Sequence, residues 1–224
     1  MPTFPKPNYT ALIARGDKHY PNRLNDLYDP PSGLYIDGDL GLLNVPMIAI
    51  VGSRKASTEG LKNAAAFAQG LSRAGLLIVS GLARGIDGAA HQATLSLGSG
   101  HFTMAVCGAG LDVIYPKEHL GLARNIRNQG LLVSEYPRGT APKSSHFPRR
   151  NRIIAALSIG VLVIEAAERS GSLITARLAL ELGREVFAVP GSIQQPLSRG
   201  SNLLIQQGAK LVQNPQDVLE ELVF

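Results

Sequence analysis

Residues 47–81 read MIAIVGSRKASTEGLKNAAAFAQGLSRAGLLIVSG, two short apolar runs joined by an amphipathic stretch. The runs, 47–52 and 75–81, are continuous rather than alternating, which is typical of strands covered on both faces. The stretch between them, 58–75, is rich in alanine and closes on glycine, a common helix stop. This order of strand, helix and strand predicts a right-handed crossover between two parallel strands.

The same pattern recurs through the rest of the chain. Further apolar runs lie at 101–108, 130–136, 160–166 and 185–191, and helix-like stretches cover 85–98, 117–130 and 173–183. A weaker strand is expected at 209–213, before a terminal helix that Asn214 and Pro215 open. Alternation of this kind predicts an α/β fold with a doubly wound, mostly parallel sheet and helices on both faces.

The first 45 residues differ in composition, because they are rich in proline, tyrosine and aspartate. We therefore expect residues 1–45 to form an irregular N-terminal extension packed against the edge of the sheet. Residues 46–224 are expected to form the core.

Composition narrows the class of protein. The chain has 224 residues, of which 45% are hydrophobic, and no apolar run is long enough to span a bilayer. The amino terminus has no signal pattern, and the single Cys107 excludes an internal disulfide framework, so we expect a cytoplasmic protein without a membrane partner. The net charge of +5 and the excess of arginine over lysine favour an anionic partner.

The corners after the expected strands share a composition. They all contain glycine, serine or threonine, and they read GSRKAST (52–58), SGLARGIDGAAH (80–91), CGAGLD (107–112), EAAERSGSLITA (165–176) and VPGSI (189–193). Ligands of doubly wound sheets bind at these carboxyl ends, and successive amides at a helix start bind anions. One such corner is equally well explained as a tight turn, whereas five along one edge predict an anion-binding rim.

Nucleotide and metal signatures are incomplete. The corner at 52–57 reads GSRKAS where a dinucleotide site has G-x-G-x-x-G, and Gly108-Ala109-Gly110 matches only in part. Lysine never directly follows glycine, which excludes a P-loop. The five histidines have no metal-ligand spacing with Cys107. No cofactor and no metal ligand are therefore predicted.

Signatures of catalysis are also weak, and no catalytic residue is assigned. Asp87 and His91 share a face of an expected helix, either as an acid–base pair or, more commonly, as a helix-capping aspartate and a locally satisfied histidine. Glu135 and Glu165 end two strands, where each could act as an acid or hold a neighbouring arginine. The many arginines favour the second role.

The segment HFPRRNR (146–152) follows a proline-rich loop and precedes an apolar helix, so we expect Arg149–Arg152 to open that helix on the surface. Arginines oppose the macrodipole at a helix N-terminus, and a bound phosphate would offset this cost. The alternative is ion pairing of these arginines with Glu135, Glu165 or Glu168.

Two flat side chains, His146 and Phe147, stand beside these arginines and could stack on unpaired bases. Glycines for phosphates, arginines for charge and an aromatic ring for bases together predict a single-stranded nucleic-acid site. Such a site reads the backbone and stacking rather than the base sequence.

Seven motifs together resemble the DNA-processing protein A (Smf) family. They are IAIVGSR (48–54), SGLARGIDGAAH (80–91), GLDVIYP (110–116), SEYPRGTAP (134–142), HFPRRNRIIAALS (146–158), EAAERSGSLITARLALELGREVFAVPG (165–191) and SRGSNLLIQQGA (198–209). They stand in the family's order from about residue 9 to residue 213, and the resemblance implies an extended Rossmann-like core.

The resemblance implies a binding protein and not an enzyme. Members bind single-stranded DNA taken up during natural transformation, protect it and help load the RecA recombinase onto it, and they act as homodimers. Many members carry a further winged-helix-like domain at the carboxyl terminus, and we expect none within residues 1–224.

Carried over to this sequence, Arg54 would be the principal phosphate clamp and Phe147 would stack on a base. Lys143 is the candidate for a lysine that the family often has three residues before the aromatic residue, where this chain has Ser144. The resemblance places the nucleic-acid site at Ser53, Arg54, Ser80, Gly81, Arg84, Gly108, Gly110, Lys143, His146, Phe147, Arg149, Arg150, Asn151, Arg152, Ser170, Gly171 and Ser172.

The family's self-association lies in the carboxyl-terminal part of the core, which makes Leu203, Leu204 and Ile205 candidates for a dimer interface. These side chains are equally well explained by packing of the last helices onto the sheet. The rival function is a nucleotide-cleaving or nucleotide-sensing protein of the phosphoribohydrolase type. Against it, the motif begun by Pro190-Gly191-Ser192 departs from P-G-G-x-G-T.

Overall fold

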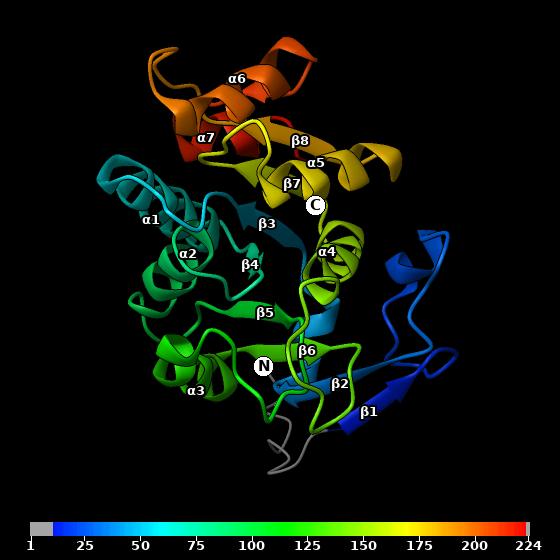
Figure 1. Ribbon diagram of the computed structural model, residues 1–224. Helices are drawn as coiled ribbons and strands as arrows, with labels where there is room; N and C mark the ends of the chain where they lie inside the picture. Colours follow the sequence, from blue (N-terminus) through cyan, green and yellow to red (C-terminus); the bar gives the residue numbers. More distant parts are fainter. Residues whose placement is uncertain (1–10, 223–224) are drawn as a thin grey trace.

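The computed structural model describes residues 11–222, and these form one sheet of nine strands with helices on both faces (Figure 1). The predicted doubly wound, mostly parallel sheet is confirmed. The strands are β1 (Ala11–Ala14), β2 (Gly33–Gly38), β3 (Met47–Val51), β4 (Leu77–Ser80), β5 (Thr103–Cys107), β6 (Leu131–Ser134), β7 (Gly160–Val163), β8 (Glu185–Ala188) and β9 (Lys210–Leu211).

The helices form a layer on each face of the sheet. Helices α1 (Thr58–Arg73), α2 (Ile86–Leu95), α3 (Leu120–Gln129) and α7 (Pro215–Leu219) cover one face, and α4 (His146–Leu157), α5 (Gly171–Glu181) and α6 (Arg199–Gln206) cover the other. Short 3-10 helices occupy η1 (Asn22–Asp26), η2 (Leu40–Asn44), η3 (Lys117–His119) and η4 (Pro196–Ser198). No helix between residues 11 and 222 is long and apolar enough to cross a membrane.

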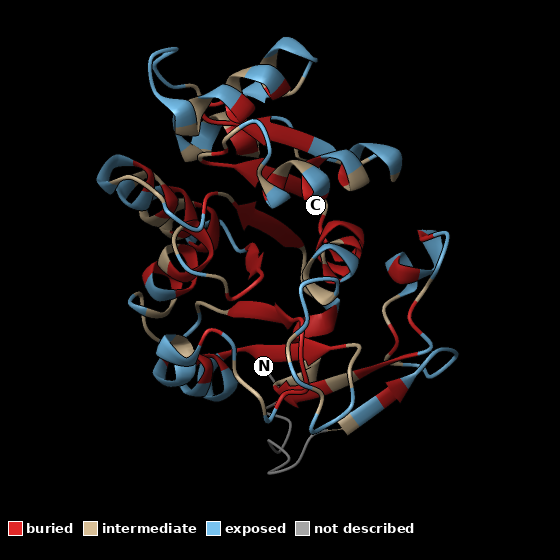
Figure 2. Cartoon of the chain, viewed as in Figure 1, coloured by how far each residue is buried: buried red, intermediate tan, exposed pale blue. Residues whose placement is uncertain are grey.

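The sheet separates two apolar layers, and alternate residues of each central strand point to opposite faces. In β3, Met47, Ala49 and Val51 pack towards α4 and α5, whereas Ile48 and Ile50 pack towards α1 and α2. The central strands β3, β4, β5, β6 and β7 are therefore buried throughout (Figure 2), which is why their sequences are continuous apolar runs.

The strand order is β1-β2-β6-β5-β4-β3-β7-β8-β9. The chain winds outward from β3 through β4 and β5 to β6, then returns through α4 and winds the other way from β7. The order therefore reverses between β3 and β7, which pair in parallel from Ile48 with Gly160 to Val51 with Val163. This reversal is where doubly wound sheets form their ligand sites.

The N-terminal residues are more regular than we expected. Strand β2 pairs antiparallel with β6, β1 pairs antiparallel with β2, and both extend the sheet at its edge. Leu34 and Ile36 of β2 are buried in the core. A short strand between prolines and glycines carries little local signal, so its pairing with β6 decides its conformation. Residues 1–10 of the expected N-terminal extension and residues 223–224 of the expected core lie outside the described residues.

His91 of α2 is fully buried beneath the sheet-facing side of that helix. Its Nδ1 lies 2.6 Å from Thr103 Oγ1, which itself donates to the Ile78 carbonyl oxygen at 2.7 Å. Because the hydroxyl has one proton, His91 Nδ1 must be the donor to Thr103, and Nε2 is left buried without a partner.

Asp87 accepts instead from the amides of Gly81 and Ala83. Asp87 therefore braces the loop before α2 and does not cap the helix as the second alternative expected, and His91 is bonded locally through Nδ1 alone.

Burial lowers the pKa of His91 to about 3, with smaller contributions from the positive charges of His119 and Arg150. In the unfolded chain His91 has its ordinary pKa of 6.5. As the pH falls below 6.5, His91 binds a proton in the unfolded chain but not in the folded chain until the pH reaches about 3, so acid lowers the free energy of unfolding. We expect the unfolding free energy to fall between pH 7 and pH 5, with a slope that approaches about 1.4 kcal/mol per pH unit for this one proton. Denaturant titrations of wild type and His91→Gln should differ in this slope, and equal slopes would contradict the assignment.

Candidate functional site

A cavity of about 540 Å³ lies at the carboxyl ends of β3 and β7, where the strand order reverses. Its walls come from the corner after β3, the corner after β7, the outer face of α4 and the first turns of α5. The lining residues are Val51, Gly52, Ser53, Arg54, Lys55, Ala83, Asp87, Phe147, Pro148, Arg150, Asn151, Ile154, Ala167, Arg169, Ser170, Gly171, Ser172, Thr175 and Leu197.

The corner after β3 is fixed by its backbone. The Ser53 amide donates to the Glu165 carbonyl oxygen at 2.7 Å, and the Ser53 carbonyl oxygen accepts from the Ile86 amide at 3.2 Å. The Ser53 hydroxyl accepts from the Lys55 amide at 3.1 Å. These bonds leave the side chains of Arg54 and Lys55 exposed at the mouth of the cavity.

Glu165 does not hold an arginine, contrary to our expectation. Its carboxylate accepts from the Ser57 amide at 2.9 Å and from the Ser57 hydroxyl, and Ser57 caps α1 by accepting from the Gly60 amide. Glu165 is therefore engaged at a helix start rather than displayed as the acid that a phosphoribohydrolase would need.

Phe147, in the first turn of α4, is the aromatic side of the cavity. The Arg54 guanidinium lies over its ring, 5.3 Å from the centroid, and the Tyr115 ring is tilted against it with 5.4 Å between centroids. Below, the ring packs on Gly108, where an added Cβ would lie 3.0 Å from it. The structure thus brings together two residues that the sequence assigned separately, Arg54 as a phosphate clamp and Phe147 as a stacking ring, in a cation–π contact.

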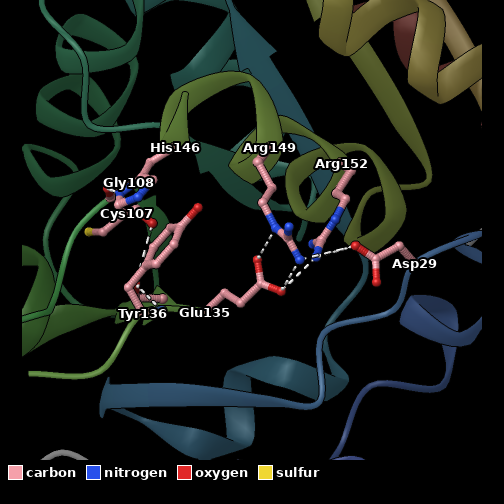
Figure 3. Close-up of polar contacts among 9 residues, drawn as sticks. Asp29, Cys107, Gly108, Glu135, Tyr136, His146, Arg149 and Arg152 are labelled. Atoms are coloured by element: carbon pink, nitrogen blue, oxygen red, sulfur yellow. Dashed lines mark hydrogen bonds and ion pairs between the residues drawn. The ribbon is translucent and has the colours of Figure 1, made fainter. Parts of the chain in front are cut away.

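His146 does not offer a second stacking face. Its ring is stacked on Tyr136 with 4.1 Å between centroids, and its Nδ1 lies 3.1 Å from the Gly108 carbonyl oxygen (Figure 3). The ring is therefore used in holding the start of α4 to the corner after β5.

A smaller cavity of about 170 Å³ adjoins Phe147 on the side of Tyr115. It contains the predicted residues Gly81 and Arg84, and Arg84 pairs there with Glu118. The complete lining is Arg54, Lys55, Gly81, Ala83, Arg84, Tyr115, Pro116 and Phe147.

The arginines of HFPRRNR do not form one basic wall. Arg149 Nη2 lies 3.0 Å from Asp29, and its Nε lies 3.3 Å from Glu135. Arg152 Nη2 lies 2.6 Å from the same Glu135, so both guanidinium groups turn towards the acids (Figure 3). Neither Arg149 nor Arg152 lines the cavity. The hydrogen bond that Arg149 donates to the Glu135 carboxylate raises the pKa of Arg149. For these two residues, ion pairing is the alternative that the structure supports.

Arg150 points in another direction because successive residues of a helix are turned by about 100°. Only 3% of it is exposed, and its Nη1 donates to the carbonyl oxygens of Gly81, at 2.6 Å, and of Val106. A Cβ added to Gly81 would clash with this guanidinium, so glycine at this position lets the guanidinium lie close to the backbone. Asn151 donates to the Gly171 carbonyl oxygen at 3.2 Å and thereby joins α4 to α5.

The other predicted residues divide between the cavity and the scaffold. Ser170 caps α5 by accepting from the Ser172 amide, and both residues line the cavity with Gly171. Ser80 is buried and donates to the Ile50 carbonyl oxygen, outside both cavities. The Gly110 amide donates to the Thr140 carbonyl oxygen, and the exposed Lys143 lines neither cavity.

Three residues of the site were missed by the sequence prediction. Lys55 and Arg169 add positive charge to the mouth of the large cavity, and Tyr115 completes the aromatic contact. Lys55 and Arg169 are direct sequence neighbours of the predicted residues Arg54 and Ser170, and this proximity could have identified them. Tyr115 lies within the motif GLDVIYP (110–116). The large cavity thus holds four cations and the single carboxylate of Asp87, an arrangement suited to an anion.

The candidate dimer residues occupy three environments on α6. Leu203 is 38% exposed, Leu204 is 7% exposed and packs in the core, and Ile205 is half-buried against that core. Leu203 borders a groove of about 330 Å³ between α5 and α6, which Ile174 and Leu180 also line.

Comparison with known proteins identifies the family. The family model of DNA recombination-mediator protein A matches residues 11–223. DNA processing protein DprA of Streptococcus pneumoniae is 53% identical over 97% of this chain and 75% of its own length. Protein Smf of Escherichia coli is 49% identical over 98% of this chain, which spans 58% of that relative's length.

Solved structures agree with the sequence matches. The X-ray structure of the S. pneumoniae protein superposes with a TM-score of 0.92 at 51% identity, covering 97% of this chain and 76% of that one. A structure of DNA processing protein A from Helicobacter pylori, described for its single-stranded DNA binding mode, gives a TM-score of 0.85 at 31% identity and covers 94% of each chain. The resemblance seen in the motifs is confirmed: this chain belongs to the DNA recombination-mediator protein A family.

Proposed function

We propose that this chain is a non-enzymatic binding protein for single-stranded DNA, and that the strand lies along the carboxyl edge of the sheet. The contact between Arg54 and Phe147 carries the proposal, because it sets a cation and an aromatic ring side by side at the mouth of a cationic cavity. Single-strand sites combine these two elements, a charged groove for the backbone and rings for the bases. The single-stranded DNA binding of the H. pylori relative supports the same assignment.

In this proposal Arg54, Lys55 and Arg169 contact phosphates. All three line the cavity, and none of the ion pairs found among residues 11–222 involves them. Arg149 and Arg152 act indirectly, because their pairing with Glu135 positions α4.

The base contact is made by Phe147, with Tyr115 as its neighbour. Arg54 covers one side of the Phe147 ring in the absence of DNA, so a base that stacks there must displace the guanidinium towards a phosphate. Stacking is available to every base, and binding would accordingly be independent of sequence.

The biological role follows from the family. We propose that the chain protects incoming single-stranded DNA in the cytoplasm during natural transformation and helps load the RecA recombinase onto it. The membership of this chain in a family of recombination mediators supports this role.

Self-association into a homodimer is also proposed. Exposed apolar side chains of Ile174, Leu180 and Leu203 gather around the groove between α5 and α6, and such a patch favours a protein contact. A two-fold dimer would put two DNA sites on one particle and raise its affinity for a long strand.

Replacing Arg54 tests the clamp. Arg54→Ala should weaken binding of oligo(dT) about tenfold or more, because a charge-assisted contact to phosphate is lost. Arg149→Ala is the matched control and should change the affinity by less than about threefold, since Glu135 and Asp29 already neutralise that charge. Fluorescence anisotropy measures both, and equal effects would refute the clamp assignment.

Salt dependence tests the kind of ligand. If three to four cations of the cavity meet phosphates, the logarithm of the association constant should fall against the logarithm of salt with a slope of about −2 to −3. Titrations of oligo(dT) at several ionic strengths give this slope. A flat response would indicate a small neutral ligand instead.

The dimer is tested by charge insertion. Leu203→Asp should shift the protein from dimer to monomer in sedimentation velocity, because a carboxylate would be buried in an apolar interface. Leu120→Asp, at an exposed leucine of α3, is the control and should leave the dimer intact. A monomeric wild-type protein, or a dimeric Leu203→Asp variant, would count against this interface.

A further inference from the structure

Arg150 is a buried cation without an acid partner. Its Nη1 is bound by two backbone carbonyl oxygens, and its Nε is buried with no hydrogen-bond partner. No ion pair joins it to a carboxylate within residues 11–222, although the charge of Asp87 acts on it from further away. Desolvation lowers the pKa of Arg150, so the charged form has an energetic cost in the unliganded protein.

Arg150 lines the 540 Å³ cavity together with Asn151 and with Gly171 at the start of α5, and these three residues are called the floor. Arg150 is buried, as are Ser172 and Thr175 of the same cavity, whereas Gly171 is exposed. A Cβ added to Gly171 would meet no atom within 4 Å, so there is open space beside the floor. The helix start contributes positive potential from its amides, so both walls of this space favour an anion.

The ion that best suits the floor is small and doubly charged. The phosphate inside a DNA strand carries one charge and is flanked by two sugars, which would both have to enter. A phosphomonoester carries about two charges and three free oxygens near pH 7, and it has one substituent. The cavity is also of the size of sites that take ligands of about one nucleotide.

We propose that the floor formed by Arg150, Asn151 and Gly171 binds the phosphomonoester of a single nucleotide. A DNA strand end carries this group, and so does a free nucleotide. For a strand end the inference rests on the proposed function: the last nucleotide would occupy the cavity while the rest of the strand leaves past Arg54 and Phe147. Such a site would give the protein a preference for one end of the strand.

Competition against an internally labelled oligo(dT) tests this, because the label leaves both ends free. The competitors are short oligo(dT) strands with a 5′-phosphate, a 3′-phosphate or only hydroxyl ends, together with thymidine 5′-monophosphate, thymidine and inorganic phosphate. One phosphorylated end should compete about tenfold better than the hydroxyl-ended strand. The other phosphorylated end is the internal control, since it adds the same charge elsewhere.

The variant test uses Gly171, whose added side chain meets open space and no strained backbone. Gly171→Asp places a carboxylate at the helix start, where it does not disturb folding, and should abolish the end preference. Gly171→Asn has nearly the same shape without the charge and should retain it. Gly121→Asp, on the exposed start of α3, controls for net charge. Melting temperatures establish that all three variants are folded.

The outcomes separate the two sources and the two proposals. If one phosphorylated end is preferred and Gly171→Asp loses this preference, the ligand of the floor is a strand end. If only thymidine 5′-monophosphate displaces the labelled strand, and Gly171→Asp loses this displacement, the ligand is a free nucleotide. Equal competition by all strands, with no displacement by the nucleotide, overturns this inference and leaves the proposed function intact. If no strand binds, the proposed function fails, and direct calorimetric titration with thymidine 5′-monophosphate then tests the phosphomonoester site: binding that Gly171→Asp abolishes supports it, and no binding overturns it.

Discussion

The guanidinium of Arg150 joins α4 to the rim of the sheet, because its Nη1 donates to the carbonyl oxygens of Gly81, after β4, and of Val106, in β5. The contact fixes the rotation of α4. With Arg150 inward, the stripe through Phe147, Asn151 and Ile154 faces the cavity at the spacing of one helix face. Gly81 is required for this approach, since any Cβ would collide with the guanidinium.

The same rotation sorts the charges of the helix. Arg149 and Arg152 are three residues apart and fall on the opposite side, where Glu135 binds both and Asp29 adds a second acid (Figure 3). Glu135 ends β6, and Asp29 comes from the N-terminal segment whose strand β2 pairs with β6. The N-terminal segment thus brings Asp29 to α4, where it pairs with Arg149. Arg54, Lys55 and Arg169, which have no acid partner among residues 11–222, line the cavity.

The cavity itself results from topology. Strands β3 and β7 are neighbours, yet the helices that follow them, α1 and α5, lie on opposite faces of the sheet. Their corners diverge and leave a gap that α4 borders, and the corner of β3 presents Arg54 and Lys55 across it. Glu165 braces this opening by capping α1 through Ser57 rather than by meeting an arginine.

The sequence alone determined the order of strands and helices, the parallel core and the glycine-rich rim, because each rests on local periodicity and turn chemistry. Motifs shared with a family also singled out Arg54 and Phe147 as candidate site residues, whereas their contact is seen only in the structure. Only the tertiary structure decided the roles of Arg149, Arg150 and Arg152, which look alike in HFPRRNR. Arg150 points to one side of the helix and Arg149 and Arg152 to the other, and the strand ends and acids that they meet are distant in sequence. The N-terminal strands were likewise decided by pairing with β6, since a short edge strand has little conformational preference of its own.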